Sequence, residues 1–181
     1  KLYELGLQDA SLPFRAHLNV TEAAVFVLSK AENPQQFTSG LERMILPLLN
    51  GLSHEQASSV DLGRIMDRLV AIVQRFNPSE NGNANVDSRF LPLLGAAITG
   101  HIFPVVNGTL SLRHFGDRDL VEKITRLQKH CLRTVPQDFA ALLPQFIETV
   151  AQCFRQKQLS SWLYAAEVVV GQYARDTRFT P

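Results

Sequence analysis

Cysteine is scarce in this chain. Only two of the 181 residues are cysteines, Cys131 and Cys153. A single pair in a chain of this length is not a disulfide framework of the kind that holds small secreted domains together. Two reduced thiols buried in helices are the expected arrangement. The sequence therefore favours a reducing compartment, the cytosol or the nucleus.

A strong charge of either sign is also missing. Eighteen Lys and Arg residues stand against seventeen Asp and Glu residues, which leaves a formal net charge of +1. Polyanion-binding domains carry a marked basic excess, so no direct nucleic-acid partner is predicted. No uninterrupted apolar run reaches the length of about 18 residues that a membrane helix needs. The longest candidate, Phe90 to Leu112, is interrupted by prolines and glycines, and no membrane partner is predicted.

Clusters that carry catalysis or bind metals are not found either. The five histidines are scattered, and no HExxH, HxH or CxxC pattern occurs. His130 and Cys131 are adjacent, so on a helix their side chains point about 100° apart and do not form a dyad. The sequence therefore predicts no enzyme: no catalytic residues, no cofactor-binding residues and no metal ligands.

Helical spacing of apolar residues fills the chain. Asn19 with Glu22 three residues later resembles a capping box, and Ser58 with Asp61 resembles another helix start. Asp117 or Asp119 can cap a later helix, which Pro136 ends, and Asp138 begins the next one. The predicted helices cover residues 20–31, 34–52, 60–76, 90–112, 117–135, 138–155 and 159–175.

Two segments interrupt this pattern. Residues 79–88, with the sequence SENGNANVDS, are almost wholly polar and form either a solvated connector or a functional loop. Residues 90–112 contain Pro92 and Pro104, which predicts one kinked helix or two short ones. The last helix has an apolar face predicted to comprise Trp162, Leu163, Ala166, Val169, Val170 and Tyr173.

A short motif recurs three times: two apolar residues, a proline and a helical continuation. The motif appears as ILPLLNGL, IFPVVNGTL and LLPQFIETV, with prolines Pro47, Pro104 and Pro144 separated by 57 and 40 residues. A HEAT-type unit has about 40–47 residues, and the longer interval contains the polar loop at 79–88. The prolines could instead be unrelated kinks in an ordinary helix bundle.

The repeat and the helix order together predict the fold. Each motif-bearing helix follows another amphipathic helix, which gives pairs at about 20–52, 60–112 and 117–155. A lone pair cannot bury its apolar face, but stacked pairs can. The prediction is an all-α, HEAT-repeat (armadillo-like) right-handed α-solenoid of about three to four antiparallel helix pairs. It is one segment over residues 1–181, with half-units at 1–10 and 159–175, and it reads as a fragment of something longer.

Basic residues line up on one predicted helix. Arg126, Lys129 and Arg133 are spaced i, i+3 and i+7, so they share one helical face. Such a stripe is either a solvated outer face or a binding patch for an acidic partner.

Several stretches resemble a known family. They are Met66–Gly82, Asp117–Val135, Asp138–Val150 and Ser160–Asp176. They look like the central part of importin-β superfamily nuclear transport receptors (karyopherins), in the transportin-SR (transportin-3) and importin-13 branch. The resemblance implies protein cargo, including serine/arginine-rich splicing factors, and release of that cargo when Ran-GTP binds to regions outside this segment. It also implies residence in cytoplasm and nucleus, with nucleoporins as further candidate partners.

A solenoid of this kind suggests where cargo would touch. The second helix of each pair usually lines the concave side, so polar residues on the motif helices are the predicted cargo contacts. They are Glu42, Arg43, Glu148, Gln152 and Arg155. The alternative function is a HEAT-repeat scaffold of a phosphatase, coat or splicing complex, and the sequence flanking this segment would discriminate between the two.

Overall fold

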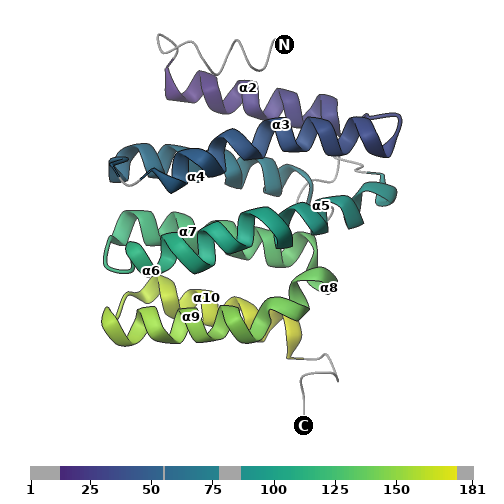
Figure 1. Ribbon diagram of the computed structural model, residues 1–181. Coiled ribbons are helices and arrows are strands. Elements are labelled where there is room, and N and C mark those ends of the chain that lie inside the picture. The colour runs from purple at the N-terminus through teal and green to yellow at the C-terminus, as the bar shows by residue number, and fades with distance from the viewer. Residues whose placement is uncertain (1–12, 55, 78–86, 175–181) are drawn as a thin grey trace.

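The computed structural model describes residues 13–54, 56–77 and 87–174, and all regular structure within them is helical. This confirms the predicted all-α repeat solenoid, which rises as a stack of helix pairs (Figure 1). The main helices are α2 (Phe14–Leu28), α3 (Pro34–Ser53), α4 (Ser59–Arg75), α7 (Arg118–Thr134), α9 (Leu143–Gln156) and α10 (Ser160–Tyr173). The predicted half-unit at 1–10 and nearly all of the polar loop at 79–88 lie outside the described residues.

One further helical run, the long helix, spans Ser88–Arg113. It joins a 3-10 turn (Ser88–Phe90), α5 (Leu91–Ala97), two π-helical segments (Ile98–Ile102 and Pro104–Leu110) and α6 (Ser111–Arg113). In α geometry, Pro104 would lack a donor and its ring would meet the carbonyl four residues earlier. The wider π turns absorb this mismatch, so the run stays one continuous helix and is not split in two.

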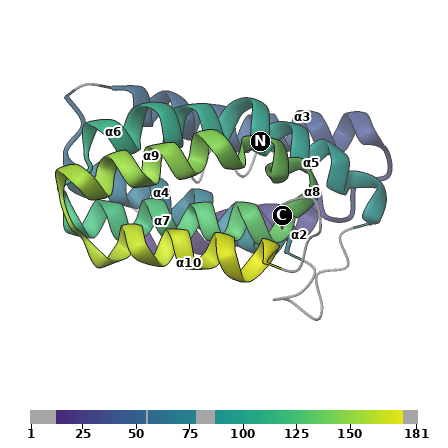
Figure 2. The same ribbon diagram turned by 90° about the horizontal axis from the view of Figure 1, so that it is seen from below.

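The helices form two layers, seen end-on in Figure 2. The first layer holds α2, α4, α7 and α10, and the second holds α3, the long helix and α9. The first-layer helices begin at residues 14, 59, 118 and 160, which are 45, 59 and 42 residues apart. Two of these intervals match a HEAT-type period, and the middle one contains the polar segment. All three motif helices lie in the second layer.

Local signals located some helix starts and missed others. Ser58 and Asp117 are N-caps, as predicted: their side chains accept hydrogen bonds from the backbone N–H of Asp61 and Leu120. The predicted start at Asn19 is wrong, because α2 begins at Phe14 and Asn19 lies inside it. The five residues before Asn19 are compatible with a helix, so the chain starts its helix directly after Pro13.

The helix after α7 also starts elsewhere than predicted, although α7 ends just before Pro136 as expected. Pro136 follows the end of α7 and itself occupies the first turn of α8 (Pro136–Phe139), so Asp138 does not open that helix. Proline suits this position because the first N–H groups of a helix have no partner within it. A 3-10 turn (Ala140–Leu142) then connects α8 to α9.

By length and composition, the long helix could cross a membrane. This was not predicted from the sequence, because prolines and glycines interrupt the apolar run. Its most apolar window has a mean hydropathy of 1.5, and 50% of that window is buried inside the fold. A core helix of a soluble protein passes the same test, so this is weak evidence for a membrane span. Here Ile98, Ile102 and Val106 face the core.

Aromatic side chains join successive pairs in the core. Phe37 of α3 stacks on Phe90 at a centroid distance of 4.6 Å, and Phe139 meets Phe103 edge-on at 5.4 Å. In α10 the buried residues are Trp162, Ala165, Val169 and Tyr173. Leu163, Ala166 and Val170, predicted to belong to this apolar face, are exposed instead.

Candidate partner-binding groove

Helix α7 lies at the centre of the first layer and carries the predicted basic stripe. Its N-cap, Asp117, accepts a hydrogen bond from the backbone N–H of Leu120 at 3.1 Å. A hydrogen bond from the Ser59 side chain, at the start of α4, lowers the pKa of Asp117, and partial burial opposes this shift. The N-termini of two neighbouring first-layer helices are therefore tied together.

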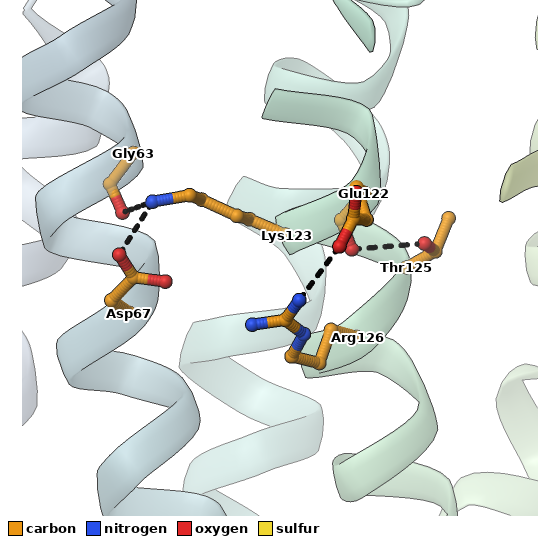
Figure 3. A network of polar contacts seen from close by, with 6 residues as sticks. All are labelled: Gly63, Asp67, Glu122, Lys123, Thr125 and Arg126. Atoms are coloured by element: carbon orange, nitrogen blue, oxygen red, sulfur yellow. Dashed lines mark hydrogen bonds and ion pairs between the residues drawn. The ribbon is translucent and has the colours of Figure 1, made fainter. Parts of the chain in front are cut away.

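A second tie between α4 and α7 lies about two turns further along. The Lys123 ammonium donates to the Asp67 carboxylate at 2.5 Å and to the Gly63 carbonyl at 3.2 Å (Figure 3). A Cβ atom at Gly63 would lie 3.3 Å from Nζ of Lys123, so the missing side chain leaves room for the approach. This contact fixes how α7 is rotated about its axis. Glu122 and Arg126 then lie on the side of α7 that faces away from α4, as Figure 3 shows.

The exposed side of α7 forms a groove with α10. Two surface hollows of about 400 and 410 Å³ follow the seam between the helices, and Tyr164 lines both. We call them together the α7–α10 groove. Its walls are Glu122, Thr125, Arg126, Lys129 and Arg133 of α7 and Ser160, Ser161, Tyr164, Glu167, Val168, Val170, Gly171 and Gln172 of α10.

All three residues of the predicted basic stripe line this groove. Arg126 donates to the Glu122 carboxylate at 2.7 Å, and the Lys129 ammonium lies 6.0 Å from the centroid of the Tyr164 ring. Arg133 lines the second hollow together with Glu167. The groove thus carries three cations and two carboxylates around one partly exposed aromatic ring.

Packing of α10 explains why Tyr164 faces outwards. The Trp162 indole is fully buried and donates to the Phe115 carbonyl at 3.2 Å, while the Tyr173 hydroxyl donates to the Pro136 carbonyl at 2.7 Å. These two anchors fix the rotation of α10, so Tyr164 stays 41% exposed. The sequence pattern did not predict this α10 wall of the groove. Its only signal was that Tyr164 falls outside the apolar spacing of the helix.

The five predicted cargo contacts are not brought together. Glu42 and Arg43 lie on α3, whereas Glu148, Gln152 and Arg155 lie on α9, and the long helix stands between α3 and α9 in the second layer (Figure 1). Glu42 is partly exposed and the other four are exposed. They are therefore available to a partner that spans the whole layer, not to a compact ligand.

The buried polar and thiol groups do not form a reactive site. Burial raises the pKa of the Cys131 thiol to about 12 and that of Cys153 to about 11, so neither is an activated nucleophile. Among the described residues, no group of three or more His, Cys, Asp or Glu side chains could hold a metal ion. Asn107, which begins a glycosylation tripeptide, has no exposed surface and is inaccessible in the folded chain.

Comparison with known proteins gives a match for the C-terminal part of the chain, which contains the groove. Residues 94–181 match the family model described as the Transportin-3/Importin-13 fourth TPR domain. This stretch of the chain is similar to that family. No solved structure matches the chain significantly. The matched family is one of transport receptors.

The transportin-3/importin-13 domain includes most of the long helix and all of α7, α9 and α10. The α7–α10 groove and three of the five predicted cargo contacts, Glu148, Gln152 and Arg155, therefore lie inside the matched region. Helices α2, α3 and α4, with Glu42 and Arg43, precede it. The description of the match names a TPR unit and the sequence predicted a HEAT unit; both are stacked antiparallel helix pairs.

Proposed function

We propose that this chain is a segment of a nuclear import receptor that binds protein cargo on its exposed helix faces and moves between cytoplasm and nucleus. The observation that supports the proposal is the match to the transportin-3/importin-13 domain, in a chain that folds as a stack of helix pairs. Such stacks present long continuous surfaces, and each unit contacts only its neighbours, so the surface can adapt to different partners.

In this proposal Ran-GTP binds to repeats outside this segment and releases the cargo, and nucleoporins bind the same receptor during passage. Serine/arginine-rich splicing factors are the proposed cargo class. The second-layer residues Glu42, Arg43, Glu148, Gln152 and Arg155 are the proposed contacts, since they are at least partly exposed along one layer.

The decisive experiment uses the complete receptor. We expect it to bind Ran loaded with GTP but not with GDP, and Ran-GTP to displace a bound serine/arginine-rich cargo in a pull-down. Charge reversal of Arg43, Glu148 and Arg155 together should weaken cargo capture and leave Ran-GTP binding intact. A matched control reverses Arg15, Asp61 and Arg64, which are also exposed but lie on α2 and α4 of the first layer. Absence of Ran-GTP binding would instead favour a scaffold in a non-transport complex.

A further inference from the structure

The α7–α10 groove has features of a peptide-binding surface beyond the general receptor function. Its α7 wall presents Arg126, Lys129 and Arg133, and its α10 wall contributes one carboxylate, Glu167. Glu122 is engaged by Arg126 at 2.7 Å. The groove therefore has an excess of positive charge, although the whole chain is almost neutral.

The arrangement of polar and apolar atoms along the groove limits what fits. The first hollow is lined by Arg126 and Lys129 on one side and by Ser160 and Ser161 on the other. The second is lined by Arg133 together with Val168 and Val170. Tyr164 stands between them, because it lines both hollows. The second hollow also holds Glu167, which offsets the charge of Arg133, so the surplus positive charge lies in the first hollow. A cation at each end, with an aromatic ring between them, suits a segment whose acidic residues flank an apolar one.

The length of the groove sets the length of that segment. On α7 it runs from Glu122 to Arg133. Eleven residues of helix rise about 16 Å, and an extended chain covers that distance with about five residues. The groove lies between two fixed helices, since Lys123 anchors α7 to α4 and Trp162 anchors α10 to the segment before α7.

We propose that the α7–α10 groove binds an extended, acidic segment of a partner protein, in which Asp or Glu residues flank an apolar residue that packs on Tyr164. The carboxylates of the segment pair with Arg126, Lys129 and Arg133, and the hydroxyls of Ser160 and Ser161 donate to the carboxylate nearest α10. The inference goes beyond the proposed function, because this acidic partner differs from the arginine-rich cargo proposed above. Peptide binding by this chain and Ran-GTP binding by the complete receptor are separate measurements, so either can fail alone.

The first test is fluorescence anisotropy of the full 181-residue chain with a labelled peptide, Gly-Glu-Glu-Leu-Glu-Glu-Gly. We expect saturable binding that weakens as ionic strength rises, because exposed charge pairs are screened. The same peptide with glutamine in place of every glutamate should not bind measurably. Equal binding of the two peptides, or no binding of the acidic one, overturns the proposal.

Matched variants locate the site. Replacing Arg126, Lys129 and Arg133 together by glutamine should weaken binding about tenfold or more, the size expected when a few exposed ion pairs are lost. The control replaces Arg15, Arg64 and Lys157, three exposed cations outside the groove, and removes the same charge. Circular dichroism checks that both triple variants fold. Equal loss in both variants would mean that only net charge matters and would overturn the proposal.

A second pair of variants tests the aromatic centre without changing charge. Tyr164→Ala should weaken binding several-fold, whereas Leu163→Ala, at the exposed neighbour that does not line the groove, should leave it unchanged. A thymidine pentanucleotide carries the same four negative charges as the peptide. If it competes as well as the unlabelled peptide does, the groove is a general anion surface and the proposal is wrong.

Discussion

Single polar side chains connect neighbouring helix pairs through residues that are far apart in sequence. The Asn107 amide, on the long helix, donates to the Thr149 hydroxyl of α9 at 2.9 Å, and Gln128 of α7 lies within 3.5 Å of the Asn107 carbonyl oxygen. Asn107 has no exposed surface. A buried amide costs free energy unless its hydrogen bonds are made, so this contact favours one register between the helices.

The first residue-scale prediction compares two threonines. Thr149→Val should lower the free energy of unfolding by about 1–3 kcal/mol, because it leaves the buried Asn107 amide without this acceptor. Thr99→Val should cost no more than about 0.5 kcal/mol, since the Gly95 carbonyl it bonds also receives the Ile98 N–H. Urea unfolding measures both, and equal losses would contradict the role given to Asn107.

The two ion pairs in Figure 3 give a second prediction. Lys123→Met should cost about 1–2 kcal/mol, because the Asp67 side chain is only 22% exposed and loses its cation. Arg126→Met should cost about 0.5 kcal/mol or less, because its Glu122 partner is 62% exposed and well hydrated. Thermal unfolding of the two variants is the measurement, and a larger loss for Arg126→Met would refute the assignment of Lys123 as the anchor of α7.

The buried thiols predict a pH dependence. Burial raises the pKa of Cys131 to about 12 and of Cys153 to about 11, whereas unfolded thiols ionise near pH 8.5 to 9. Above that pH the unfolded state loses protons that the folded state keeps, so stability falls between about pH 9 and 11. The loss is up to about 1.4 kcal/mol per pH unit for each thiol. The double variant Cys131→Ala, Cys153→Ala should show a shallower decline than the parent in unfolding titrations across this range.

At the scale of one element, the long helix combines a buried face with an outward face of small residues. Pro92, Ala96, Gly100, Pro104 and Gly108 are four residues apart and all exposed. Ile98, Ile102 and Val106 face the core. The prolines and glycines among these five are weak helix formers, and the helix tolerates them on one side because the other side is held by packing.

Glycines on this one helix should respond to alanine to different degrees. Gly100→Ala and Gly108→Ala should each stabilise the chain by about 0.5–1 kcal/mol, since an added Cβ meets nothing within 4 Å and neither glycine has a positive φ. Gly95→Ala should stabilise less than either, because its Cβ would lie 2.5 Å from a carboxylate oxygen of Asp138, and this exposed side chain must turn away. Melting temperatures of the three variants decide this, and a larger gain for Gly95→Ala would contradict the packing described.

At the scale of the whole molecule, stability is distributed along the stack. Among the described helices, the main contacts lie within a helix pair or between adjacent pairs, and α10 packs against α7 and α9. Stability in such an array is approximately a sum of unit and interface contributions. A destabilising substitution in a terminal helix should therefore lower the stability of that end and leave the distant helices folded.

Trp162 offers a test of this behaviour. Trp162→Ala should remove about 3–5 kcal/mol, because it deletes a fully buried indole and its hydrogen bond to Phe115. Hydrogen exchange should accelerate throughout α10 while α4 keeps its protection. A uniform acceleration over the described helices would mean that the chain unfolds as one cooperative unit.

Part of the α7–α10 groove was predictable from sequence. The spacing of Arg126, Lys129 and Arg133 places them on one face of a helix, because helical period alone decides which residues share a face. The opposite wall was not predictable. Tyr164 and Ser160 reach the groove only because α10 packs beside α7 with Trp162 and Tyr173 inwards.

The sequence by itself determined the class of fold, the layer to which each motif helix belongs and the caps at Ser58 and Asp117. The caps follow from contacts within one helical turn, and the fold class and the layers follow from the order of amphipathic helices along the chain; residue spacing records both directly. The tertiary structure decided the continuity of the long helix through Pro104, the contacts of Lys123 with Asp67 and of Asn107 with Thr149, and the groove itself. The residues in these contacts are 42 to 56 positions apart, and only the packing of one repeat on the next brings them within hydrogen-bond distance.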